Sequence, residues 1–196
     1  MMFDHGRLQG MPRAQAGLFC LLAAKRLVPV YRAFSEKYRS GTDVNAEVLE
    51  LLFQQVGRWH GLPLQALHQR LYEAIPDTRD FSDELADQAQ CAVIGTCYCI
   101  ECLLAGEPDK ARWAVGKVLE AIDVLDEPLE QEIAHELAWC SSLLELLECG
   151  EQDDPRSIAR LRWDNQQHCV PAMANDLPGR ISAMTLRQLA AGAWNA

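Results

Sequence analysis

The segment 82–105 constrains the fold of this chain more than any other stretch. Between Cys91 and Leu104 the only charged residue is Glu101, and apolar side chains fall on every side of the helix that the segment predicts. A helix that is apolar all round is normally buried and packed by other helices on several sides. We therefore predict that 82–105 is a buried central helix, with Asp80 or Ser82 as its N-terminal cap.

The rest of the chain repeats apolar residues at spacings of three and four, which is the period of amphipathic helices. Proline and glycine separate the segments, and the predicted helices cover 12–38 with a kink or break at Pro29, 43–60, 63–75, 108–125, 128–149, 155–168 and 181–190. Strand-like alternation is absent. We predict an all-α fold, a single-domain bundle of about seven helices around the central helix. We expect one domain over 1–175 and a peripheral, weakly ordered tail over 176–196.

The N-terminal segment and the longest apolar run indicate where in the cell the protein is expected. Residues 1–10 carry Asp4, His5 and Arg7 and lack the apolar core of a signal peptide. The longest apolar run, 16–24, is shorter than the ~20 residues that span a bilayer. We expect a soluble, cytoplasmic protein without a membrane partner.

The chain contains eight cysteines, most of them inside apolar helical segments. Free cysteine behaves as a small buried hydrophobe in reducing compartments. One continuous helix cannot converge four thiolates on a zinc ion. We therefore interpret the group on the central helix as packing residues rather than a metal site: Cys91, Cys97, Cys99 and Cys102.

The net charge of −10 is unevenly distributed along the chain. Residues 43–154 hold twenty-four Asp and Glu against six Lys and Arg, whereas both ends are basic. An acidic middle repels phosphates and makes nucleic-acid binding unfavourable. It leaves a basic protein as the expected partner, and the predicted docking surface is an acidic band that straddles Pro128: Glu120, Asp123, Asp126, Glu127, Glu130, Glu132 and Glu136. A solvated surface without a partner is the alternative interpretation of this band.

Two motifs resemble the YjaG-like family, a bacterial domain of unknown function (DUF416). The first is the opening "F..LA.R..P.Y..F", formed by Phe19, Leu22, Ala23, Arg26, Pro29, Tyr31 and Phe34, and the second is the turn "EAIPDT.DF" at residues 73–81. The small-residue helix with Ala89 and Ala92 is also similar. The chain departs from the family at Cys91, where an aspartate is favoured, and at Phe53-Gln54, in place of a Trp-Glu pair. The resemblance implies an all-helical fold and supplies no activity.

Catalytic signatures are weak. Glu132 and His135 match one Glu-x-x-His element of di-iron bundles, but that chemistry needs two such elements. Glu101 is a lone carboxylate among apolar neighbours, for which we favour an exposed or hydrogen-bonded environment over a buried one with a raised pKa. We predict no cofactor and no catalytic or metal-binding residues.

These observations favour a non-enzymatic protein-binding or regulatory protein that masks a basic partner, as immunity proteins mask toxins. The alternative is an enzyme or metal-dependent protein with a site between the central helix and the helix of His135. The sequence does not indicate an oligomeric state.

Overall fold

The computed structural model describes residues 5–38, 43–123 and 130–149. These residues form eight α-helices, two short 3-10 helices and no strand: α1 (His5–Gln9), α2 (Arg13–Lys25), α3 (Val28–Tyr38), α4 (Val44–Gln54), η1 (Trp59–Gly61), α5 (Leu64–Glu73), η2 (Thr78–Asp80), α6 (Glu84–Ala105), α7 (Pro108–Asp123) and α8 (Glu130–Cys149). The predicted all-α bundle is confirmed. The predicted helices at 155–168 and 181–190 and the predicted tail at 176–196 lie outside the described residues.

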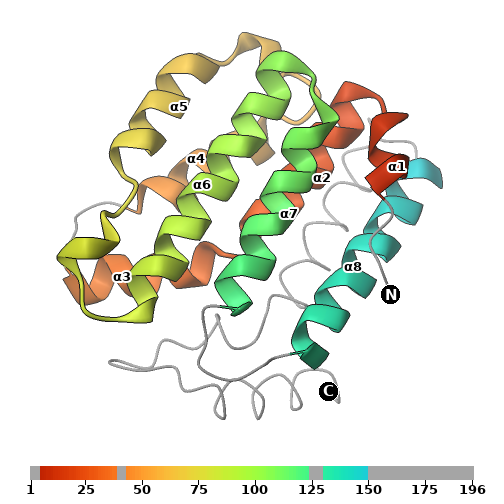
Figure 1. The fold of residues 1–196 in the computed structure, drawn as a ribbon. Coiled ribbons are helices and arrows are strands. Elements are labelled where there is room, and N and C mark those ends of the chain that lie inside the picture. The colour runs from red at the N-terminus through yellow and green to blue at the C-terminus, as the bar shows by residue number, and fades with distance from the viewer. Residues whose placement is uncertain (1–4, 39–42, 124–129, 150–196) are drawn as a thin grey trace.

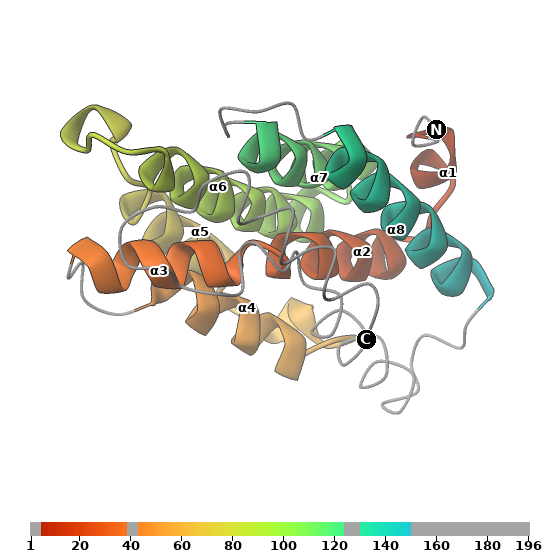
Figure 2. The same cartoon turned by 90° about the horizontal axis from the view of Figure 1, so that it is seen from below.

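Helix α6 occupies the centre of the bundle, as the sequence predicts. It packs most extensively against α7 and also contacts α2, α3 and α5. In Figure 1, α5, α6 and α7 lie side by side in front, with α2, α3 and α4 behind them, and α8 flanks α7 (Figures 1 and 2). The buried side chains of α6 and its neighbours merge into one hydrophobic core.

Helix α6 is held at both ends by local interactions. At its start, the Asp83 carboxylate accepts a hydrogen bond from the Leu85 N–H at 3.1 Å. The prediction of Asp80 or Ser82 as the cap is therefore wrong: Ser82 lies one residue before the cap, and Asp80 belongs to η2 three residues before it. At its end, Gly106 adopts a positive φ of 70° and its N–H donates to the Cys102 carbonyl. Glycine reaches this left-handed conformation without the strain that a Cβ would introduce.

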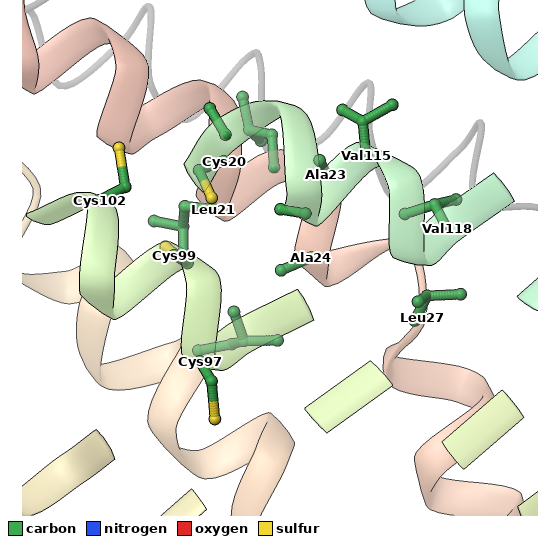
Figure 3. Close-up of a cluster of buried hydrophobic side chains, with 14 of the residues drawn as sticks. Cys20, Leu21, Ala23, Ala24, Leu27, Cys97, Cys99, Cys102, Val115 and Val118 are labelled. Atoms are coloured by element: carbon green, nitrogen blue, oxygen red, sulfur yellow. The ribbon is translucent and has the colours of Figure 1, made fainter. Parts of the chain in front are cut away.

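Helices α2 and α6 approach each other closely at Gly17. A Cβ on Gly17 would lie 2.4 Å from Leu103 Cδ2, so a larger residue would force this contact apart. The Cys99 thiol lies 3.9 Å from the Gly17 carbonyl oxygen across the same contact. Figure 3 shows the core where α2, α6 and α7 meet, filled by small and branched side chains.

The predicted break near Pro29 is confirmed, and the predicted end of the next helix is corrected. The segment 12–38 is divided into α2 and α3, with Pro29 in the first turn of α3, where its missing N–H costs least. The predicted helix 43–60 ends at Gln54, and Gly57 has a positive φ of 78°. Trp59 then donates its indole N–H to the Leu52 carbonyl at 2.8 Å, which returns the chain to the core.

By length and composition, α6 is the one helix of the described residues that could cross a membrane, and 67% of that segment is buried inside the bundle. The core helix of a soluble protein passes the same test.

Candidate functional site

The described part of the predicted acidic band lies at the C-terminal end of α7. Glu120 and Asp123 are both exposed there, and Asp123 is the last residue of the helix. Lys117 lies one turn before Glu120, and its Nζ is 2.5 Å from Glu120 Oε2. Asp126 and Glu127 lie outside the described residues, as do the side chains of Glu130 and Glu132.

Glu136 does not belong to this band, and its assignment to a surface is wrong. Its side chain is only 3% exposed and forms an ion pair with Arg26 of α2, whose Nη2 lies 2.6 Å from Glu136 Oε2. A second contact joins Arg26 Nε to Glu136 Oε1. The guanidinium also lies 4.1 Å from the ring centroid of Trp139. These interactions attach α8 to α2 inside the bundle.

Burial and the ion pair act in opposite directions on Glu136. Removal of the carboxylate from water raises its pKa above the ordinary value, while the Arg26 guanidinium opposes that rise. Cys140, one turn along α8, is also buried, and the pKa of its thiol is raised for the same reason. The Arg26–Glu136 ion pair therefore has a structural role, because it attaches α8 to α2.

Glu101 is half-buried and hydrogen-bonded, as the sequence analysis favoured. Its Oε1 lies 3.0 Å from His68 Nε2 of α5, and its Oε2 lies 2.6 Å from Lys110 Nζ of α7. Burial works to raise the pKa of this carboxyl, but Lys110 and His68 together hold it below the ordinary value. Lys110 also lies over the ring of Trp113, at 4.2 Å from its centroid. This cluster connects α5, α6 and α7, the three helices that lie side by side in Figure 1.

The side-chain contacts of Glu101 in the described residues are with His68 and Lys110 and not with a thiol. Cys97 lies one turn before Glu101 on α6, and the pKa of its thiol is raised to about 12 by burial first and by Glu101 second. A thiol with such a pKa is almost wholly protonated at neutral pH, and the thiolate is the reactive form. The arrangement can hold a proton or an ion pair at the surface of the bundle, but its described residues do not form a nucleophilic pair.

The cysteines of α6 are buried packing residues, as predicted. Burial raises the pKa of Cys91 and of Cys102 to about 12, and Cys97 points away from the other labelled thiols in Figure 3. Within the described ranges, no group of three or more His, Cys, Asp or Glu side chains is placed to hold a metal ion.

The two sequence motifs meet in the structure and form one aromatic cluster. Phe34 of the opening motif packs edge-on against Phe81 of the turn, with ring centroids 5.0 Å apart, and Tyr38 contacts both rings. Asp77 caps η2 by accepting the Arg79 N–H. Gln90 of α6 donates to the Pro76 carbonyl at 2.9 Å. The residues of the turn therefore position α3 against the start of α6, which is a structural role.

The alternative site between the central helix and His135 has little support from the packing. Helix α8 packs against α2 and α7, and α7 lies between α8 and α6 in both views of the molecule (Figures 1 and 2). The titratable side chains that contact Glu101 of the central helix come from α5 and α7, and they are His68 and Lys110.

Arg26 is the residue of greatest consequence that the sequence analysis left unassigned. It directly follows Lys25 at the end of the apolar run of α2, beside the buried residues Ala24 and Leu27. A buried guanidinium needs a carboxylate partner, but the sequence indicates neither that Arg26 rather than Lys25 is buried nor which of the twenty-eight acidic residues pairs with it.

The fold and these clusters define the class of protein as an all-α bundle around one apolar helix. No family model matches the sequence, and no curated protein matches it significantly. Among solved structures, a DUF416 family protein from Shewanella baltica OS155 is similar, with a TM-score of 0.71 and 22% sequence identity. The match covers 86% of this chain and 95% of that chain. This similarity shows that the chain shares the fold of that DUF416 protein, which is the all-helical fold that the two motifs implied.

Proposed function

We propose that this protein is a non-enzymatic binding protein that docks a basic partner protein through the acidic C-terminal end of α7. The observation that carries the proposal is the position of two exposed carboxylates, Glu120 and Asp123, where the last turn of α7 contains no basic residue. The C-terminal end of a helix has a partial negative charge, so carboxylates there reduce helix stability. A cationic partner surface would compensate that cost.

The charge of the chain supports the same class of partner. The net charge is −10, and the excess of acidic residues lies in the segment that contains α7. Complementary charge accelerates encounter and excludes partners of the wrong sign. The mode of action that we propose is masking of a basic surface, as immunity proteins mask toxins.

We propose that this binding takes place in the cytoplasm. The six cysteines that the structure describes as free are all buried. Free buried thiols are typical of proteins in reducing compartments.

The test is an affinity pull-down from the native host followed by mass spectrometry, and then kinetics with the partner that is captured. We expect Glu120→Lys with Asp123→Lys to slow association about tenfold or more at low salt, because electrostatic steering is lost. The helical circular dichroism spectrum should not change, since surface substitutions usually cost at most about 0.5 kcal/mol each.

The matched control reverses two exposed carboxylates elsewhere, Glu47→Lys with Glu73→Lys. It changes the net charge equally and should slow association only slightly. Equal association rates for the wild type and the α7 variant would show that the acidic end is only a solvated surface.

A further inference from the structure

Gly116 lies in the middle of α7 without a structural reason in the described part of the chain. Glycine in a helix interior costs about 1 kcal/mol relative to alanine. Gly116 is exposed, its φ is not positive, and a Cβ there would meet nothing within 4 Å. An exposed helical glycine of this kind is explained if another surface approaches the backbone of α7 closely.

Trp113 is one turn before Gly116 on the same face. Its side chain is 44% exposed, which is unusual for a large aromatic residue that no partner covers. Tyr98 packs against it in an edge-on geometry, with centroids 5.4 Å apart, and Lys110 lies over its ring. A tryptophan that its neighbours hold in place loses little entropy on binding, and tryptophan is enriched among residues that dominate interfaces.

The residues around Gly116 are self-complementary about a two-fold axis. At 100° per residue, one side of α7 carries Asp109, Arg112, Trp113, Gly116, Leu119, Glu120 and Asp123. In an antiparallel pair with its axis at Gly116, a residue before the glycine faces the residue equally far after it in the other copy. Arg112 then faces Glu120 of the other copy, and Trp113 faces Leu119.

We propose that two copies of this chain associate through the outer faces of their α7 helices, which cross antiparallel at Gly116. Gly116 permits the close approach, Trp113 and Leu119 supply apolar contact, and Arg112 joins the Lys117–Glu120 ion pair of the other copy as a second cation for Glu120. The front of α7 is not covered by another described helix in either view (Figures 1 and 2), and Arg112 and Glu120 are exposed.

The same arrangement predicts the type of crossing. Asp109 faces Asp123 of the other copy, seven residues or about 10 Å along the helix from the crossing point. Parallel alignment of the axes would bring these like charges together at both ends. An inclined crossing, as in the commonest class of helix packing, separates them.

The association does not rest on the proposed function, because it is measured on the protein alone. The two proposals share the Glu120 and Asp123 end of α7. Docking of the basic partner does not require Gly116, so Gly116→Leu tests self-association separately.

The experiment is sedimentation equilibrium of the full chain from micromolar to near-millimolar concentration. We expect a reversible monomer–dimer equilibrium. Gly116→Leu should lower the association constant by about tenfold or more, because a bulky side chain blocks the crossing. Its thermal stability should be equal to or above that of the wild type, since leucine is the better helix former and its Cβ would meet no atom within 4 Å.

A charge exchange tests the two-fold arrangement. Arg112→Glu and Glu120→Arg should each weaken the dimer, and the double variant should restore it. These residues are eight positions or about 12 Å apart along one helix, so they cannot pair within one chain. A monomer at every concentration would overturn the proposal, as would a dimer that Gly116→Leu does not weaken or a double variant that does not recover.

Discussion

Arg26 and Glu136 are two full charges inside the bundle, at 1% and 3% exposure. Their attraction offsets the cost of removing both from water only while both are present. Glu136→Gln leaves the Arg26 guanidinium buried without a counter-charge. We expect this change to lower the free energy of unfolding by roughly 3–5 kcal/mol, measured by urea denaturation.

The double variant Arg26→Met with Glu136→Leu is the control for this pair. It removes both charges and keeps similar volumes, so it should lose much less stability than the single variant. A double variant as unstable as Glu136→Gln would show that packing rather than charge attaches α8 to α2.

The ion pairs of Glu101 predict that the free energy of unfolding depends on pH in the acid range. Its pKa is below the ordinary value in the folded protein, because Lys110 and His68 outweigh burial. Such a group stabilises the fold above its unfolded pKa of about 4.3, and that contribution is lost as the pH falls through the lower folded value. We expect Glu101→Gln to be less stable than the wild type at neutral pH. The difference in the free energy of unfolding, measured by urea denaturation, should shrink as the pH falls toward the pKa of Glu101 in the folded protein. A difference independent of pH would mean that the ion pairs contribute nothing.

At the scale of helices, Asp83 joins α3 to the start of α6. It caps α6 through the Leu85 N–H, pairs with Lys37 at 2.5 Å and accepts a hydrogen bond from the Tyr38 hydroxyl. We expect Asp83→Ala to cost about 1–2 kcal/mol from the lost cap alone. Asp83→Asn keeps an oxygen that can cap the helix and should cost less, as measured by thermal unfolding. Equal losses for the two variants would assign the effect to the Lys37 ion pair.

At the scale of the whole molecule, the cysteines report on the integrity of the core. Burial raises the pKa of Cys20, Cys91, Cys97, Cys102 and Cys140. We expect these thiols to react with a thiol reagent only after unfolding, because the thiolate is the reactive form and access is blocked. Thiol counting in denaturant without reductant should find all eight. Fewer than eight would indicate disulfide bonds, and rapid reaction of the native protein would contradict the buried assignment.

The sequence determined the features that depend on a chain segment by itself. A helical segment that is apolar all round is normally buried, and the part of α6 from Cys91 to Leu104 carries only one charge, so the central place of α6 followed from its composition. Proline and glycine set most helix boundaries to within a few residues, because their backbone preferences act locally. The boundary at Gln54 was missed because the return of the chain depends on the side chain of Trp59, whose indole N–H donates to the Leu52 carbonyl seven residues earlier.

Only the tertiary structure decided which charges are buried and which are exposed. Glu120 and Glu136 both lie in acidic helical segments, but Glu136 meets Arg26, 110 positions earlier in the chain. Likewise, Trp113 is a large aromatic residue of the kind that usually packs in a core, but its side chain is 44% exposed. Burial of a side chain depends on which helices pack against its face, and that arrangement is a property of the assembled bundle rather than of any one segment.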